Sequence, residues 1–314
     1  MTMRPSRTIF FREHICLCPA VLLFLAALFS CSSAPKRVML VNDVSNVAYS
    51  QLDLGNRSII EENYDRAAAS LASAYRLALS VDSTDLLCKV LLSTIVFKIA
   101  CPSVDELMAA PSLERTSPFM FLPNEEILAQ AKRLASRASE RELLLSLCSV
   151  YEVRILLEGE AAGSDDGGIE ARSMSLYLSS LAEARKKVSK EAYYLAYLSR
   201  TAGDVCMAGK DYAGAQKHFL EAAKIHTKNR YLIEIGLDWY CLARAYSLGG
   251  RKSDAVSAIE TALRYDKDAE NNHGIASDYM AYSKILLRGS PDEEERRLAE
   301  ELASWGRRIL LAGE

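Results

Sequence analysis

Proline and tryptophan are scarce in this 314-residue chain, which has eight prolines and two tryptophans. Three prolines stand in the first 35 residues, four stand between 101 and 123, and the last is Pro291. Because proline removes a backbone donor and interrupts helices, the stretches without it are free to form long helices. The region 101–123 is instead predicted to be a Pro-rich loop, with one short helix near 104–109.

Strongly basic segments and catalytic motifs are also missing. The formal net charge is −3 and no block of Lys and Arg occurs, so nucleic acid is not an expected partner. The chain has no G-x-S-x-G, no H-E-x-x-H and no dinucleotide-binding glycine fingerprint. With four histidines in all and no spaced ligand set, we expect no metal, no cofactor and no enzymatic activity.

Cysteine pairs with C-x-x-C spacing do not occur. Beyond residue 31 the cysteines number five, which is odd, and most of them fall inside apolar helical patterns. We therefore expect buried thiols that act as small hydrophobic residues, and no disulfide framework. These cysteines are Cys88, Cys101, Cys148, Cys206 and Cys241.

The N-terminal segment has the order of a secretion signal. Arg4, Arg7 and Arg12 precede an apolar run at 15–29, which is too short for a comfortable membrane span. After Phe29 no uninterrupted apolar run reaches the length of a span. An uncleaved N-terminal anchor and an ordinary signal peptide are two interpretations of this pattern.

A third interpretation follows from the end of the run. Leu28-Phe29-Ser30-Cys31 resembles the lipobox of bacterial lipoproteins, in the relaxed form known from spirochaetes, with Phe29 departing from the usual residue. The resemblance implies a lipoprotein signal peptide at 1–30, a palmitate-type lipid on Cys31 and a tether at 31–44. The signal carries three Arg and one Glu, so its removal changes the net charge from −3 to about −5.

A repeated unit between 200 and 266 indicates the fold. Tyr212, Ala215, Phe219 and Ala222 share one helical face, and Ala255, Ile259 and Ala262 repeat the pattern forty residues later. Gly203 and Ala243, in the preceding helices, are small enough to let two helices approach closely. Gly209 and the pair at 249–250 fall where a turn needs positive φ.

These residues resemble the tetratricopeptide repeat (TPR). Trp239-x-x-Leu242-Ala243-x-x-Tyr246 with the alanines that follow fits the TPR pattern, and Leu54-Gly55 with Tyr64 and Leu71 forms a similar unit nearer the N-terminus. The period is forty residues where the family has 34, and we assign the extra residues to a linker at 227–235, which lengthens the next helix or its approach. The resemblance implies a right-handed solenoid of helical hairpins.

The rest of the chain is predicted to complete an all-α repeat domain at 45–314. About a dozen helices and no sheet are expected, and the final helix, which follows Pro291, is expected to turn Trp305 inward. Further helices are predicted at 85–100, 124–139, 140–158, 169–188, 277–287 and 292–311.

In TPR proteins the first helix of each hairpin lines a concave face that commonly binds peptide. Transferred to this chain, that face contains Tyr and Arg side chains suited to protein recognition. The alternative is that the charged members are merely solvated. The predicted partner-binding residues are Tyr197, Arg200, Asp204, Tyr240, Arg244, Lys284 and Arg288.

The sequence thus favours a non-enzymatic lipoprotein that acts as an adaptor for a partner protein. It would be held by Cys31 in the bacterial cell membrane or outer membrane and would face the periplasm. An alternative is an accessory TPR subunit of a periplasmic solute-uptake system that partners a substrate-binding protein. The partner, the oligomeric state and the role of the Pro-rich loop, as a cover or as a contact, stay open.

Overall fold

The computed structural model describes residues 43–101, 118–164 and 168–313. In these residues the chain forms 12 α-helices and one short 3-10 helix, without strands, which confirms the all-α class. The predicted signal peptide, Cys31 and nearly all of the tether lie outside the described residues. So does the short helix that the sequence predicts near 104–109.

The described helices follow one another with short connections, apart from the Pro-rich region. Their bounds are α2 Asp43–Ile60, α3 Tyr64–Ser80, α4 Thr84–Ala100, η1 Pro118–Phe121, α7 Asn124–Ala135, α8 Arg141–Gly163, α9 Ala171–Val188, α10 Ala192–Ala208, α11 Tyr212–Asn229, α12 Leu232–Leu248, α13 Lys252–Asp268, α14 Asn272–Leu286 and α15 Glu293–Gly313.

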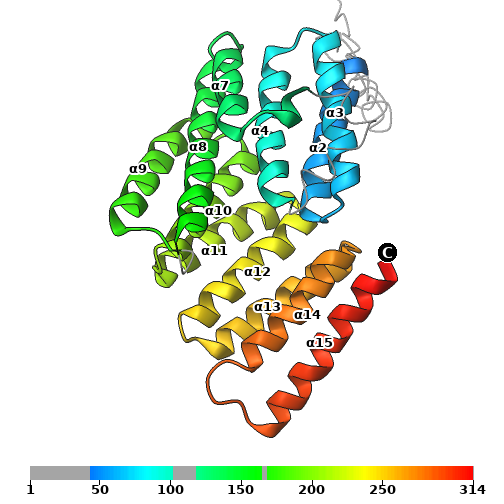
Figure 1. Ribbon diagram of the computed structural model, residues 1–314, viewed down its shortest axis with the longest axis vertical. Helices are drawn as coiled ribbons and strands as arrows, with labels where there is room; N and C mark the ends of the chain where they lie inside the picture. The colour runs from blue at the N-terminus through cyan, green and yellow to red at the C-terminus, as the bar shows by residue number, and fades with distance from the viewer. Residues whose placement is uncertain (1–42, 102–117, 165–167, 314) are drawn as a thin grey trace, which may run out of the picture. The chain divides into compact units, whose positions relative to one another are not determined.

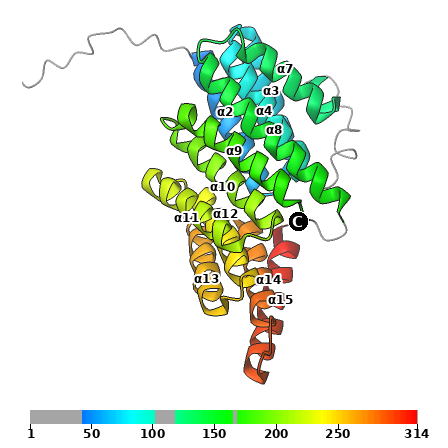
Figure 2. The same ribbon diagram turned by 90° about the vertical axis from the view of Figure 1, so that its left-hand side faces the viewer.

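The helices pack as consecutive antiparallel pairs (Figures 1 and 2). The pairs are α2 with α3, α4 with α7, α8 with α9, α10 with α11, α12 with α13, and α14 with α15. The second helix of each pair also packs against the first helix of the next pair. Packing between sequence neighbours of this kind is typical of repeat proteins.

The tight turns after α2, α3, α10, α11, α12 and α13 share one backbone conformation. Each contains a residue with φ between 50° and 77°, followed by a residue whose N–H donates to the carbonyl five positions earlier. This arrangement is a Schellman motif, which ends a helix by satisfying its last carbonyls. The left-handed residues stand 20 positions apart within each run, at Glu62 and Asp82, and at Lys210, Arg230, Gly250 and Glu270.

The turns correct two expectations. The residues 227–235 do not form a separate linker, because α11 runs to Asn229 and α12 begins at Leu232, and they lengthen the helices instead, as one of the two predicted alternatives has it. The additional residues of the forty-residue period lie in the helices, which are 17 or 18 residues long from α10 to α13. Gly209 also has an ordinary φ of −77°, and its neighbour Lys210 takes the left-handed position.

Small residues lie where the two helices of a hairpin come closest, as predicted. A Cβ placed on Gly203 of α10 would collide with the ring of Phe219 on α11. Ala215 and Ala255, on the second helices, are fully buried. In the first hairpin, a Cβ on Gly55 would likewise strike Leu71 of α3. In both hairpins the glycine and the residue that it contacts are 16 residues apart, so the two hairpins have equivalent packing.

The described end of the Pro-rich loop packs against the helices. Met120 of η1 is buried in the core with Phe97 of α4. Phe119 contacts Tyr75 of α3 edge to face, with ring centroids 5.3 Å apart, while Phe121 stays exposed. This end of the loop therefore belongs to the core.

The five cysteines beyond residue 31 are buried and free, as expected. Trp305 does not turn inward: its exposed fraction is 47%, and Ala299, Leu302 and Gly306 are the residues of α15 that are buried against α14. Trp305 lies at the edge of that contact, beneath the guanidinium of Arg308. Within the described ranges, every helix is too short or too polar to cross a membrane.

Candidate functional site

Two adjoining hollows lie on the first helices of the last four hairpins. One has a volume of about 500 Å³ and is lined chiefly by α8, α10 and α12, and the other, of about 540 Å³, is lined by α12 and α14. Arg244 and Leu248 of α12 line both hollows and so join them. We call this continuous surface the inner groove.

The α12–α14 part of the inner groove brings together four residues predicted from the sequence. Tyr240, Arg244, Lys284 and Arg288 line it beside Met280. Burial raises the pKa of Tyr240, and the positive charge of Arg244 opposes that shift, so the phenol stays neutral. The three cations are exposed and have neither a hydrogen bond nor an ion pair to any described residue. They are available to carboxylates of another molecule.

The α8–α10 part of the groove is occupied by internal contacts. Arg154 of α8 donates to Asp204 of α10 across 2.6 Å and to Glu158 across 2.8 Å. Tyr197 of α10, which does not line either hollow, stacks on Tyr151 of α8, with ring centroids 5.0 Å apart and an interplanar angle of 25°. Tyr197 and Asp204 therefore tie two hairpins together, and their predicted contact with a partner stays a prediction.

Arg200 belongs to a buried polar network between three helices. Its Nε donates to Asp238 of α12 across 2.8 Å, and the other oxygen of Asp238 lies 2.6 Å from Nδ1 of His226 on α11. The side chain of Arg200 is only 13% exposed, and that of Asp238 is fully buried. The structure thus gives Arg200 a role in holding hairpins together, while its predicted role in partner binding stays a prediction.

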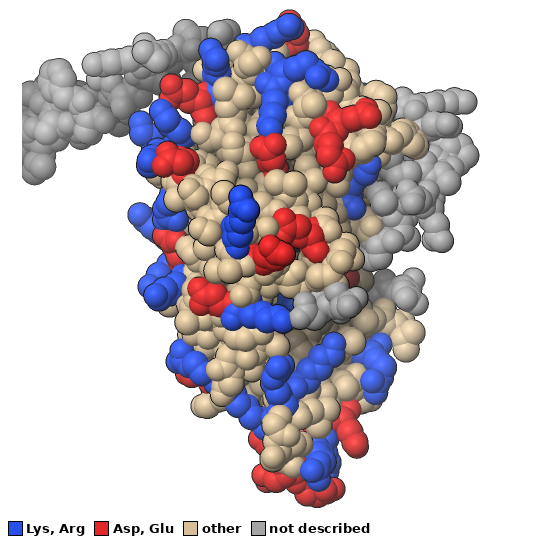
Figure 3. All heavy atoms as spheres, turned by 60° about the vertical axis from the view of Figure 1, so that its left-hand side comes forward, with Lys and Arg blue, Asp and Glu red and all other residues tan. Residues whose placement is uncertain are grey.

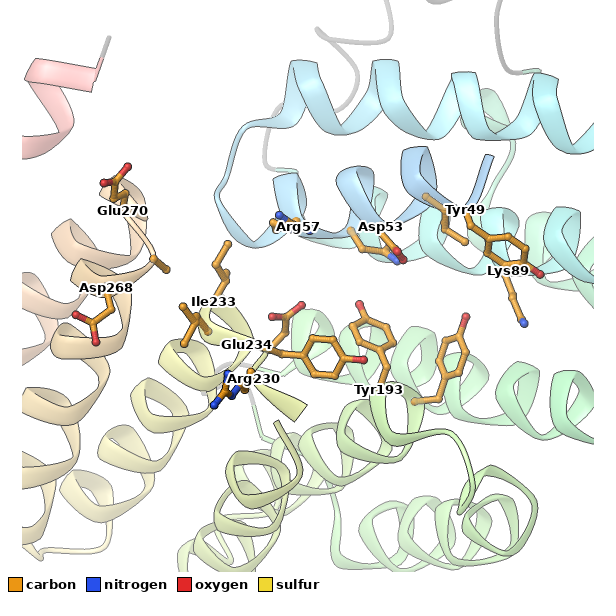
Figure 4. A pocket seen from close by; sticks show the side chains of 16 residues that line it. Tyr49, Asp53, Arg57, Lys89, Tyr193, Arg230, Ile233, Glu234, Asp268 and Glu270 are labelled. Carbon is orange, nitrogen blue, oxygen red and sulfur yellow. The ribbon is translucent and has the colours of Figure 1, made fainter. Parts of the chain in front are cut away.

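A third hollow, of about 690 Å³, was not predicted from the sequence. It lies between α2 on one side and the beginnings of α10 and α12 on the other, with contributions from α4 and the turn between α13 and α14 (Figure 4). We call it the tyrosine cleft, after the four tyrosines that line it, Tyr49, Tyr193, Tyr194 and Tyr231. Sequence reasoning missed it because its walls come from distant parts of the chain.

Charges of both signs lie on the face of the molecule shown in Figure 3. On the face shown in Figure 3, the Lys and Arg side chains are interspersed with Asp and Glu, a pattern typical of a solvated helical surface. Among the residues with described positions, no three His, Cys, Asp or Glu side chains are grouped as a metal site would require. The inner groove and the tyrosine cleft are accordingly the two candidate sites.

No model of a known protein family matches the chain, and no curated protein matches it either. The resemblance to tetratricopeptide repeats therefore rests on the repeated residues themselves.

Proposed function

We propose that this chain is a lipid-anchored, TPR-like adaptor of the bacterial periplasm that binds a segment of a partner protein in its inner groove. The observation that carries the proposal is the set of three exposed cations, Arg244, Lys284 and Arg288, around a 540 Å³ hollow. Their positive charge contrasts with the net negative charge of the chain. The hairpins would form a right-handed solenoid, with the groove on its concave side.

The chemistry of the groove defines the partner segment. Arginine and lysine donate charge-assisted hydrogen bonds to carboxylates, and arginine can bind both oxygens of one carboxylate at once. Tyr240 and Met280 supply contact area for apolar side chains in the same hollow. The partner segment should therefore carry Asp or Glu close to apolar residues.

The anchor would place this groove beside the membrane. A lipid on Cys31 would hold the domain through the tether at 31–44, in the cell membrane or the outer membrane. A single acyl chain binds a membrane only weakly, so a stable anchor requires the several chains that a lipoprotein carries. The periplasmic side then offers extracytoplasmic subunits and binding proteins as partners.

Changing Cys31 to Ser tests the anchor, because we expect no other cysteine to be lipidated. Labelled palmitate should incorporate into the parent chain and not into Cys31→Ser, and the variant should leave the membrane fraction. The matched control is Cys241→Ser, which replaces a buried thiol of the helical domain and should leave labelling unchanged. Continued labelling of Cys31→Ser would show that another residue carries the lipid.

Crosslinking in intact membranes, followed by purification of the full chain, tests the adaptor. We expect one extracytoplasmic protein to be captured reproducibly by the parent chain and to be lost when the charges of the groove are reversed. Capture of a substrate-binding protein would narrow the function to an accessory subunit of solute uptake. Capture that does not depend on the groove would contradict the proposal.

A further inference from the structure

The tyrosine cleft is lined by four tyrosines together with charged side chains of both signs. Tyr193 lies at its centre, with ring centroids 5.5 Å from Tyr194 and 6.0 Å from Tyr231, and both neighbours are inclined at 79° to it. Burial raises the pKa values of Tyr193 and Tyr194 above the usual tyrosine value, so both phenols stay protonated. Rings set at steep angles present faces and edges to the same space, as in the aromatic cages that bind organic cations.

Two carboxylates enter this space from opposite walls. Asp53 projects from α2 and Glu234 from the first turn of α12, with Tyr193 beside Glu234 (Figure 4). Neither carboxylate has a hydrogen bond or an ion pair to a residue that the structure describes. Burial raises the pKa of Asp53, Arg57 lowers it, and the negative charge of Glu234 raises it further. The two negative charges thus share one space, which a positive charge between them would stabilise.

Three cations line the cleft, Arg57, Lys89 and Arg230, and none of them forms an ion pair with Asp53 or Glu234. Lys89 of α4 lies in the same cleft, but its Nζ is 2.8 Å from Glu140 and 5.7 Å from the centroid of the Tyr49 ring. Its side chain is only 12% exposed, so it is held at the wall. Lys89 therefore lies at one end of the cleft. The charge of Arg57 acts on Asp53 without forming an ion pair, so Asp53 and Glu234 both keep their hydrogen-bond acceptors open to a ligand.

We propose that the tyrosine cleft binds a small organic amine whose ammonium group lies between Asp53 and Glu234 and whose carbon skeleton packs on the tyrosine rings. The volume of about 690 Å³ is in the range of small-molecule sites. An ammonium donates charge-assisted hydrogen bonds to both carboxylates and is attracted to the faces of Tyr193 and Tyr231. This inference is independent of the inner groove and does not rest on the proposed adaptor function.

Isothermal titration calorimetry at low salt, with four probes, tests this site. Phenethylamine and spermidine carry ammonium groups, 2-phenylethanol is a neutral counterpart of phenethylamine, and phenylacetate is an anionic one. We expect at least one amine to bind at least tenfold more tightly than either counterpart. The proposal is overturned if neither amine binds, or if the alcohol or the acid binds as well as the amines.

Matched variants locate the site. Asp53→Asn and Glu234→Gln should each weaken amine binding at least tenfold, because each removes one of the two charges that receive the ammonium. Glu301→Gln removes one carboxylate from the exposed face of α15 and should leave the affinity unchanged. Melting temperatures close to that of the parent would show that the variants are folded. Amine binding that survives both cleft substitutions would place the ligand elsewhere and overturn the proposal.

Discussion

At the scale of single residues, the repeat places a buried polar pair at equivalent positions in two successive junctions between hairpins. The first junction lies between α11 and α12, and the second lies between α13 and α14. His226 with Asp238 in the first junction corresponds to Asp266 with Asp278 in the second, forty residues later. Arg200 neutralises Asp238, whereas the second junction pairs two carboxylates. Burial raises the pKa of Asp278 to about 9, and the charge of the adjacent Asp266 contributes further. Asp278 therefore keeps its proton at neutral pH and donates it to Asp266.

This buried proton makes stability depend on pH. In the unfolded chain Asp278 loses its proton near its ordinary value of 3.8, while the folded chain keeps it up to about pH 9. Between these values the folded state binds the extra proton, so the free energy of unfolding falls as pH rises.

Asp278→Asn should remove this dependence, because an amide donates to Asp266 without titrating. Relative to the parent, the variant should gain about 1 kcal/mol or more of stability between pH 5 and pH 8. Urea unfolding at several pH values measures the change. Asp268→Asn, which alters an exposed carboxylate at the end of α13, is the control. Parallel pH profiles for the parent and Asp278→Asn would exclude the shared proton.

At the scale of elements, the turns that close the helices rely on left-handed residues, and only one of the six in the tight turns is a glycine. Gly250, at φ 77°, ends α12. A side chain at such a position costs about 1–2 kcal/mol. Gly250→Ala should therefore lower the free energy of unfolding by about 1 kcal/mol.

Gly159 provides a control for which substitution by alanine should change the free energy of unfolding in the opposite direction. It lies within α8, is exposed and has open space where a Cβ would stand. Gly159→Ala should raise stability by about 0.5–1 kcal/mol, because alanine loses less backbone freedom in a helix. Chemical denaturation of both variants measures the pair. A stability of Gly250→Ala equal to that of the parent would contradict the account of the turns.

Much of the helical structure and of the packing within hairpins was predictable from the sequence, because local residue patterns determine both. The close contacts of Gly203, Ala215 and Ala255 follow from small residues at helical spacing. A separate linker at 227–235 was wrong, while the alternative that these residues lengthen a helix was right. Nothing in the composition marks Arg230 as the left-handed residue at which α11 ends. The prediction for Trp305 was wrong because Ala299, Leu302 and Gly306 form the face of α15 that packs on α14, and Trp305 lies off that face.

At the scale of the whole molecule, both candidate sites depend on how hairpins are placed beside one another. The forty-residue period was enough to align Tyr240, Arg244, Lys284 and Arg288, because neighbouring repeats stack in register. The tyrosine cleft could not be predicted from the sequence, because it depends on a contact between α2 and α12, which are almost 180 residues apart in the chain. Local periodicity carries no information about a contact of that kind.

The central claim is that the cationic inner groove binds the partner. Its most direct test is the affinity of the captured partner for Arg244→Glu, measured beside Lys217→Glu, an equal charge reversal on the exposed side of α11. Because Arg244 lines both hollows, its reversal should weaken binding at least tenfold, about 1.4 kcal/mol, while Lys217→Glu should bind like the parent. Both variants should melt like the parent. Equal affinities for the two variants would contradict the groove as the binding site.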